Sequence, residues 1–289
     1  MRRLIAVMVL ALLGPVGGAW AQVLPPNAAG VAMGHLHYNV KNIEANRKFW
    51  IALGGQPVMM GTREVFKFPG ALVLLNQADS TAGTEGSVLN HVGFRVQNTV
   101  KALERLKALG YKTEMAASGT QTVGSVYSPE DERIELLEDQ SVNVKFVADG
   151  QENRYTPPPP MSEPIRLHHV HYYVPENDVK AVKDWYVKLF GAVPGRRYRS
   201  VDESYAAADL PGLNINVAPH EKLAPIKGRR LDHIGFEVRN LEAFCKKLEA
   251  SGVKLDRPYA KNQTGLATAF FTDPWGVYVE LTEGLNSVK

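Results

Sequence analysis

The sequence predicts an α+β protein built from four copies of one unit, arranged as two tandem domains. The first observation is a six-residue phrase that occurs four times and reads His, aliphatic, any residue, aromatic, any residue, Val. The second is that an amphipathic helical pattern and then short β-type runs follow each phrase. The third is a proline run that divides the four copies into two pairs. A repeated supersecondary unit constrains the fold more strongly than composition does.

Each six-residue phrase has the two-residue period of a β-strand. The phrases span residues 35–40, 91–96, 169–174 and 233–238. The leading His of each phrase therefore points to one face of a strand, and the aliphatic, aromatic and Val side chains point to the opposite, packed face.

A helix is predicted after every phrase. Apolar residues recur at helical spacing, and a glycine ends each run, at Gly54, Gly110, Gly191 and Gly252. Short β-type runs separated by turn residues then predict about three strands. The unit is therefore a strand, a helix and three further strands.

A proline-rich segment at residues 155–164 is predicted to separate two domains, because a proline run cannot join a sheet and favours a stiff spacer. We predict a first domain over residues 30–140, a connector with the proline-rich linker over 141–164, and a second domain over 165–289. Residues 128–136 align without gaps on residues 273–281, so the halves resemble duplicates. Two units are expected to pair within each half.

The N-terminus is predicted to be a secretory signal peptide. Met1-Arg2-Arg3 precedes an apolar run over residues 4–13, a break at residues 14–15 and the small-residue pattern of residues 19–21. This order predicts cleavage after Ala21, which removes residues 1–21. A membrane anchor is disfavoured, because about ten apolar residues fall short of the ~20 that span a bilayer. We therefore expect an exported protein, periplasmic or extracellular, with no stable membrane insertion after cleavage.

Charge and cysteine content narrow the classes of partner. The formal net charge of +3 falls to about +1 without Arg2 and Arg3, which gives no indication of a nucleic-acid or acidic-lipid partner. The single Cys245 excludes an internal disulfide, so the fold depends on its cores, for which 45% hydrophobic residues are ample. Any metal site must then be built from His and carboxylates. The sequence gives no oligomeric state.

Two sets of metal-ligand residue types stand at equivalent strand positions. Each half has two strand His residues and one strand Glu: His35, His91 and Glu135 in the first, and His169, His233 and Glu280 in the second. Two imidazoles and one carboxylate on one face of a divalent ion leave coordination positions open for substrate oxygens. We therefore predict one three-ligand metal site in each half.

These patterns resemble the vicinal oxygen chelate superfamily, the group of glyoxalases, bleomycin-resistance proteins and extradiol dioxygenases. The resemblance covers nearly all of the chain after the signal peptide, and residues 231–238 (LDHIGFEV) and 273–281 (DPWGVYVEL) carry it most closely. It implies two tandem glyoxalase-like domains, in which paired βαβββ modules form a cup-shaped mixed sheet around a divalent metal. Carried over by position, it implies the same two ligand sets.

Two departures from the family pattern bear on the reaction. The strands that supply a fourth ligand in many glyoxalase-type members have no carboxylate here, at residues 72–75 (LVLL) and 214–217 (NINV). Three ligands are therefore implied, as in the ring-cleaving dioxygenases. Those enzymes place a Tyr shortly before the Asp-Pro and a His further upstream, where this chain has Phe270 and residues 263–265 (QTG). The usual acid and base of ring cleavage are thus not in their expected positions.

Strand geometry supplies other candidates, because residues two apart share a face. His171 is a candidate general acid or base, with Tyr173 beside it, since an imidazole titrates near neutral pH. His168 is expected to face away from the site. Substrate-binding candidates on the ligand faces are Asn214, Asn216, Glu237, Tyr278 and His37. Leucines at positions 72 and 74 replace the two asparagines in the first half, so a more apolar site is expected there.

The function expected from these observations is a metal-dependent enzyme that binds a small substrate through adjacent oxygens, with lyase, isomerase or dioxygenase chemistry. The ligand set suits Fe²⁺, Mn²⁺, Ni²⁺ or Zn²⁺, and export disfavours a labile Fe²⁺. One alternative is a protein that sequesters a small molecule, as bleomycin-resistance members do. Another is one catalytic domain and one structural domain. The sequence names no substrate.

Overall fold

The structure is a computed structural model that describes residues 23–116, 122–138, 145–148, 151–154, 161–198, 204–263 and 265–287. The predicted signal peptide and most of the proline-rich linker lie outside the described residues. No helix in the described part of the chain is both long enough and apolar enough to cross a bilayer.

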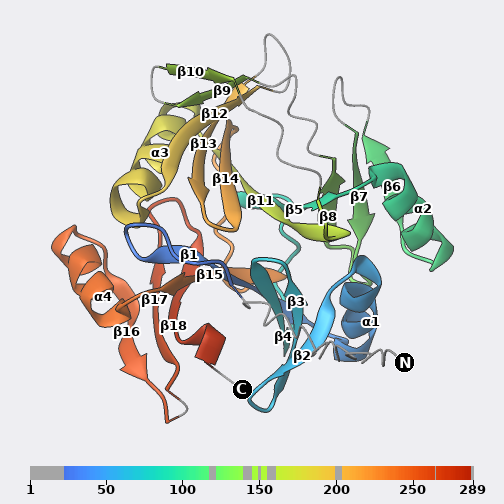
Figure 1. The fold of residues 1–289 in the computed structure, drawn as a ribbon, viewed down its shortest axis with the longest axis horizontal. Helices are drawn as coiled ribbons and strands as arrows, with labels where there is room; N and C mark the ends of the chain where they lie inside the picture. The colour runs from blue at the N-terminus through green and yellow to red at the C-terminus, as the bar shows by residue number, and fades with distance from the viewer. Residues whose placement is uncertain are drawn as a thin grey trace, which may run out of the picture.

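The predicted unit of one strand, one helix and three strands occurs four times (Figure 1). Unit 1 contains β1 (Val31–Val40), α1 (Ile43–Leu53), β2 (Gln56–Met60), β3 (Arg63–Phe68) and β4 (Ala71–Gln77). Unit 2 contains β5 (Leu89–Val96), α2 (Thr99–Ala108), β6 (Thr113–Ala116), β7 (Val123–Tyr127) and β8 (Arg133–Leu137).

The second half of the chain repeats this order. Unit 3 contains β11 (Ile165–Val174), α3 (Glu176–Phe190), β12 (Val193–Tyr198), β13 (Ser204–Leu210) and β14 (Leu213–Pro219). Unit 4 contains β15 (Leu231–Val238), α4 (Leu241–Ala250), β16 (Leu255–Lys261), β17 (Ala267–Thr272) and β18 (Tyr278–Glu283), followed by the short helix η2 (Leu285–Ser287). The connector holds a hairpin of β9 (Lys145–Ala148) and β10 (Gln151–Arg154), which lies near β12 in Figure 1.

Local sequence accounts for the helix boundaries. Asn42, Asn98 and Asn240 each accept a hydrogen bond from a backbone N–H in the first turn of the helix that follows. Such side chains satisfy amide groups that have no partner inside the helix. Helix α3 ends at Gly191, which adopts the left-handed conformation that glycine reaches without steric cost.

The units pair differently from the sequence expectation. One eight-stranded sheet has the order β16-β17-β18-β15-β1-β4-β3-β2 and joins unit 1 to unit 4. The other has the order β12-β13-β14-β11-β5-β8-β7-β6 and joins unit 3 to unit 2. The expected α+β fold of paired βαβββ units in two mixed sheets is confirmed, but each sheet takes one unit from each half of the chain.

The two central strand pairs are antiparallel and place the phrase histidines face to face. In the first sheet, His37 of β1 lies opposite His233 of β15. In the second sheet, His171 of β11 lies opposite His91 of β5. Both registers contain a β-bulge, between Met33 and His35 in β1 and between Leu167 and His169 in β11.

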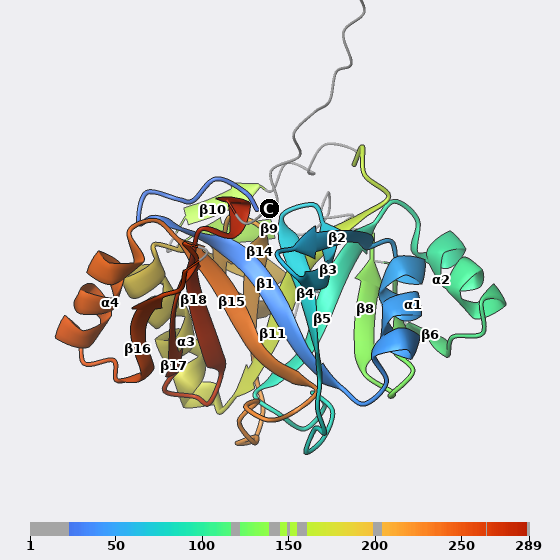
Figure 2. The same ribbon diagram turned by 90° about the horizontal axis from the view of Figure 1, so that it is seen from below.

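Units that are consecutive in the chain pack together through their helix sides. Trp50 of α1 contacts Phe94 of β5, with ring centroids 6.2 Å apart, and Phe190 of α3 contacts Phe236 of β15, at 5.1 Å. Figure 2 shows α1 and α2 at one end of the molecule and α3 and α4 at the other. The apolar side chains of the phrases join this helix-facing core, which leaves the histidines on the opposite face of each sheet.

Polar contacts add to the packing of consecutive units. Asp273, in the turn between β17 and β18, accepts hydrogen bonds from Tyr186 of α3 at 3.0 Å and Tyr172 of β11 at 3.3 Å. Its other oxygen accepts from the backbone of the same turn. In the first half, Glu130 accepts from the backbone N–H of Lys41 at 2.8 Å and from Asn46 of α1 at 2.9 Å.

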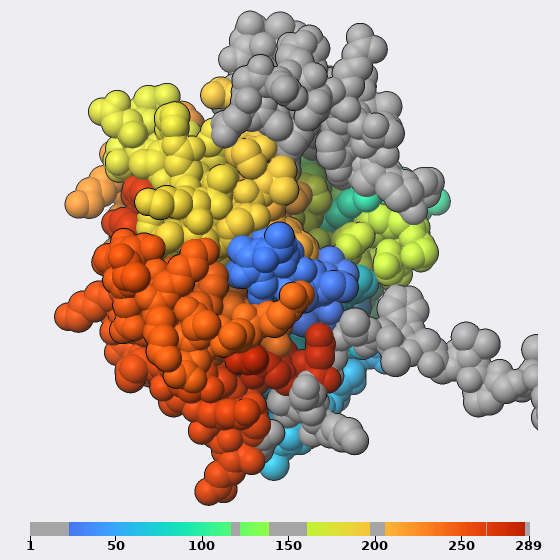
Figure 3. Space-filling view, turned by 60° about the vertical axis from the view of Figure 1, so that its left-hand side comes forward, coloured from blue at the N-terminus to red at the C-terminus, as the bar shows by residue number. Residues whose placement is uncertain are grey.

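The beginning of the described chain is held against the second half. Figure 3 shows this blue segment between the yellow atoms of unit 3 and the orange atoms of unit 4. The side chain of Asn27 donates to the carbonyl of Phe190, and the backbone N–H of Met33 donates to that of Pro211.

Candidate metal centres

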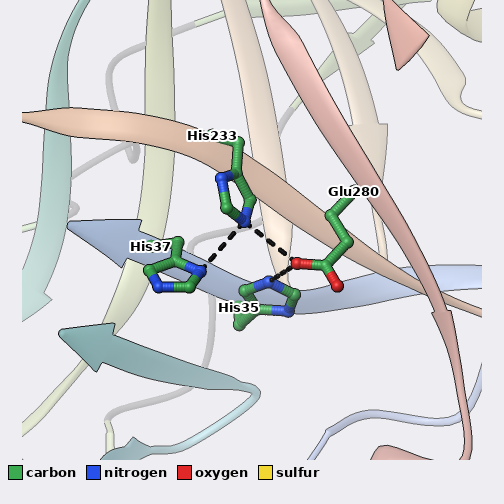
Figure 4. A group of neighbouring side chains, drawn as sticks. All are labelled: His35, His37, His233 and Glu280. Atoms are coloured by element: carbon green, nitrogen blue, oxygen red, sulfur yellow. Dashed lines mark hydrogen bonds and ion pairs between the residues drawn. The ribbon is translucent and has the colours of Figure 1, made fainter. Parts of the chain in front are cut away.

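Each sheet brings metal-ligand side chains together on the face opposite its helices. The 1–4 centre consists of His35, His37, His233 and Glu280, from β1, β15 and β18 (Figure 4). The 2–3 centre consists of His91, His169, His171 and Glu135, from β5, β11 and β8.

One carboxylate oxygen is the focus of the 1–4 centre. Glu280 Oε2 lies 2.9 Å from His35 Nε2 and 2.9 Å from His233 Nε2, and His37 Nδ1 lies 3.0 Å from the same His233 nitrogen (Figure 4). Burial alone would raise the pKa of Glu280, but the facing imidazoles His35 and His233 lower it well below its usual range. The carboxylate is therefore ionised near neutral pH.

A second carboxylate orients His233. Asp232 Oδ2 lies 2.6 Å from His233 Nδ1 and accepts a hydrogen bond from it, which directs Nε2 at Glu280 and the centre. Burial lowers the pKa of His233, but its hydrogen bonds with Asp232 and Glu280 outweigh burial, and the net pKa is raised. A carboxylate behind a ligating imidazole is the arrangement that fixes ring orientation in metal sites.

Glycine at the third position of the phrase makes room for the neighbouring imidazole. The ring of His35 lies directly over Gly235, and a Cβ atom at that position would overlap its Cε1 and Nδ1 atoms. The ring of His169 lies over Gly93 in the same way. Close approach of a side chain to the backbone, rather than a special backbone dihedral, therefore requires glycine at these two positions.

His37 lies between the 1–4 centre and an arginine. Arg63 of β3 places Nη2 3.4 Å from His37 Nε2 and donates from the same nitrogen to the carbonyl of Leu75 at 3.0 Å. Burial, with His233, His35 and Arg63 nearby, lowers the pKa of His37 to about 2. An arginine only donates, so Nε2 of the neutral ring accepts and the proton sits on Nδ1, which faces the centre.

The 2–3 centre repeats the geometry with wider spacing. His91 Nε2 lies 3.5 Å from His169 Nε2, and the two oxygens of Glu135 lie 3.5 Å and 3.4 Å from these two nitrogens. The coordinating atoms of His91, His169 and His171 all lie within 4.8 Å of one another. Burial, with His171 and Arg133 nearby, lowers the pKa of His91 well below its usual range, so the ring is neutral.

Three residues around the 2–3 centre have roles that the sequence analysis did not assign. His168 was expected to face away, but its Nδ1 lies 2.9 Å from Nδ1 of His169, because the β-bulge of β11 breaks the alternation at this point. Arg133 Nη2 and the side-chain oxygen of Asn90 lie 3.0 Å and 2.9 Å from His91 Nδ1. Only the position of Asn90, directly before the phrase like Asp232, could have indicated such a role.

The expected grouping of ligands within each half is corrected by the structure. His169 does not join His233 and Glu280, and His35 does not join His91 and Glu135, because β1 and β11 are exchanged between the sheets. All six residues still converge in two groups of two His and one Glu. Each group therefore contains residues from both halves of the chain, and each still consists of two His and one Glu.

The other candidate residues lie at different places relative to the centres. Tyr173 packs against His171 with ring centroids 4.9 Å apart. Asn214 and Asn216 of β14 lie beside His169 and His171 in register, and Asn214 donates to His168 at 3.3 Å. The Oδ1 atom of Asn216 is buried without a hydrogen-bond partner among the described residues.

Tyr278 of β18 and Glu237 of β15 make different contacts. Tyr278 lies 5.7 Å from His233 between ring centroids and stacks on Phe270, so it borders the 1–4 centre. The buried Glu237 carboxylate accepts from Thr282 at 3.0 Å and from the backbone N–H of Gly284 at 2.8 Å. These contacts connect the Glu237 side chain to the C-terminal segment.

The donor atoms fit a divalent ion. Two ligands about 2.1 Å from an ion stand about 3 Å apart in octahedral geometry and about 3.4 Å apart in tetrahedral geometry. The separations of 2.9 Å to 3.0 Å in the 1–4 centre and 3.4 Å to 3.5 Å in the 2–3 centre match these values. His35 Nδ1 is buried without a partner among the described residues, so its Nε2 alone serves the centre.

Comparison with known proteins agrees with the fold. Residues 166–281 match the family model "Glyoxalase/Bleomycin resistance protein/Dioxygenase superfamily". No curated protein matches the sequence.

Three solved structures show how far the similarity extends. Glyoxalase I from Zea mays has a TM-score of 0.66 at 15% identity over 89% of this chain and 93% of that chain, and a mutant form of the same enzyme has a TM-score of 0.66 at 15% identity over 90% and 97%. A putative dioxygenase from Bacillus subtilis subsp. subtilis str. 168 has a TM-score of 0.62 at 15% identity over 87% and 85%. These structures share the fold along most of the chain. The family match itself covers residues 166–281, in units 3 and 4, and the solved structures extend the similarity of fold to units 1 and 2.

Proposed function

We propose that this protein is an exported, metal-dependent enzyme that binds one divalent ion in each centre and acts on a small substrate through adjacent oxygens. The observation that carries the proposal is the duplicated donor set: two imidazoles and one carboxylate converge twice, in two separate sheets. A protein that only encloses a small molecule has no need for two buried groups of ionisable ligands, whose burial is costly without a cation.

The contacts of the side chains support a separate set of metal ligands for each centre. His35, His233 and Glu280 would hold the ion in the 1–4 centre, and His91, His169 and Glu135 would hold it in the 2–3 centre. A bound divalent ion supplies Lewis-acid polarisation of substrate oxygens. Fe²⁺, Mn²⁺, Ni²⁺ and Zn²⁺ all suit these ligands. Lyase, isomerase and dioxygenase reactions all use such polarisation.

Stabilisation of the substrate oxygen in the 1–4 centre is assigned to His37. Arg63 occupies its Nε2, so the Nδ1 proton is directed at the space between His35 and His233. The neutral imidazole in this position can donate a hydrogen bond from Nδ1 to a substrate oxygen and stabilise the negative charge that develops on it. His171 is the corresponding residue of β11 and is assigned the same role in the 2–3 centre.

Metal analysis followed by activity screening tests this proposal. The mature protein is dialysed against Zn²⁺, Mn²⁺, Ni²⁺ or, without oxygen, Fe²⁺, and is then assayed with α-ketoaldehydes and catechols. We expect two ions per chain and metal-dependent turnover. His37→Gln should keep the metal and lower kcat by about 100-fold in the 1–4 centre, since loss of one well-placed donor to a developing oxyanion costs about that much.

His220→Gln is the matched control, because His220 stacks on Tyr173 and belongs to neither centre. It should leave turnover by the 1–4 centre unchanged. A chain that binds no divalent ion would contradict the proposal. Two bound ions with tight ligand binding and no turnover would identify a binding protein instead.

A further inference from the structure

Arg63 is a half-buried arginine beside the 1–4 centre without an anionic partner. No carboxylate of the described residues lies within ion-pair distance of its guanidinium, whose hydrogen bonds go to His37 and to the carbonyl of Leu75. By contrast, Arg47 is paired with Glu64 at 2.7 Å, and Arg133, beside the 2–3 centre, is paired with Glu85 at 3.2 Å. Partial burial of an unpaired cation is costly, and an anion bound to it offsets that cost.

The position of Arg63 places such an anion at a defined separation from the metal ligands. Its Nη2 lies on the far side of the His37 ring from His233, so one imidazole ring stands between the guanidinium and the ligand atoms. A ligand that chelates an ion in the centre and also reaches Arg63 therefore needs a spacer of about one ring between its chelating oxygens and its anionic group.

The surface between these two points is apolar. Arg63 and Val65 share a face of β3, and Val65 packs with Leu72 and Leu74 of β4. These two leucines lie beside His35 and His37 in register. In the 2–3 centre, Asn214 and Asn216 occupy the corresponding positions beside His169 and His171. The two centres thus differ in the polarity of the strand next to the ligands.

We propose that Arg63 is a specificity-determining residue that binds a carboxylate of the substrate, so that the 1–4 centre takes a small organic acid with an apolar spacer between its carboxylate and its chelating oxygens. This inference rests on the proposed function. A single planar guanidinium suits a singly charged, planar carboxylate, which it binds through two parallel hydrogen bonds. The 2–3 centre, whose arginine already has a carboxylate partner, does not share this preference.

Binding of two matched probes to the Zn²⁺-loaded protein tests the inference. The parent chain carries His169→Ala, which removes the 2–3 centre, and the probes are 3,4-dihydroxybenzoate and catechol. The carboxylate of 3,4-dihydroxybenzoate also changes the acidity of its catechol oxygens. The readout is therefore the ratio of the two Kd values, which calorimetry measures for the parent and for each variant. We expect Arg63→Gln to weaken 3,4-dihydroxybenzoate by about tenfold and catechol by less than about twofold, as loss of one charge-assisted contact predicts.

Two further variants separate recognition from folding. Arg63→Lys should recover part of the preference for the acid, because it restores the charge without the planar fork. Arg133→Gln should leave the ratio unchanged. An equal loss of both probes, or an unchanged ratio in Arg63→Gln, would overturn the inference and leave the proposed function intact. Failure of both probes to bind in a Zn²⁺-dependent manner would overturn the proposed function and the inference together.

Discussion

At the scale of single residues, each centre depends on a glycine as much as on its ligands. Gly235 and Gly93 occupy the third position of their phrases, where units 1 and 3 have His37 and His171. The absence of a side chain lets the imidazole of the opposite strand lie close against the backbone. The sequence showed the four phrases clearly, but the reason for glycine in two of them became visible only with the strand pairing.

Substitution of these glycines should remove the centres one at a time. In Gly235→Ala the added methyl group displaces His35, so we expect one of the two Zn²⁺ sites to weaken by at least about tenfold, as for loss of ligand positioning in other metal sites. Gly93→Ala should do the same to the other site through His169. Zn²⁺ titration against a chromophoric chelator measures both. Unchanged affinity in either variant would show that the imidazole position is not constrained by the glycine.

At the scale of elements, the turn between β17 and β18 joins units 3 and 4 through a buried charge. Burial raises the pKa of Asp273 to about 6, although backbone amides and Tyr186 oppose this shift. Because the folded-state pKa lies above the unfolded value, the folded state binds the proton more tightly. The stability that this group contributes is fully present below the unfolded pKa near 4 and is lost as pH rises through about 6.

Denaturant unfolding of the metal-free protein at pH 5 and pH 8 tests this linkage. The wild-type protein should lose about 1 kcal/mol of unfolding free energy through Asp273 over this interval, since one pKa unit corresponds to about 1.4 kcal/mol. Asp273→Asn cannot ionise, so its unfolding free energy should lack this component. The unfolding free energy of Asp273→Asn, relative to that of the wild-type protein, should therefore increase as the pH rises. A difference that is independent of pH would show that Asp273 does not titrate in this range.

At the scale of the whole molecule, the repeated unit and the α+β fold could be predicted, but the partner of each unit could not. Units 1 and 3 have His at the third phrase position and units 2 and 4 have Gly, so each sheet needs one unit of either kind. Pairing within halves satisfies this requirement as well as the observed exchange does. The bulge at His168 and the approach of Arg63 to His37 also depend on register and packing, which no local pattern encodes.

Two double variants distinguish the observed pairing of units from pairing within each half, through the number of metal ions bound per chain. The double variant His35→Ala/His233→Ala removes two ligands from one centre and should retain one ion per chain. His35→Ala/His91→Ala removes one ligand from each centre and should retain none. Pairing within halves would give the opposite result. Native mass spectrometry measures the ions and shows in the same experiment whether the chains remain folded.

The pairing of unit 1 with unit 4, and of unit 2 with unit 3, also has a consequence for biosynthesis. Strand β1 obtains β4 early, but its other neighbour, β15, is separated from it by unit 2, unit 3 and the connector, and the paired residues His37 and His233 are 196 positions apart. While the ribosome is still making the second half, the hydrogen-bonding edges of both β1 and β5 stand open. Open edges accept strands from other chains, so the nascent first half needs protection until its partners emerge.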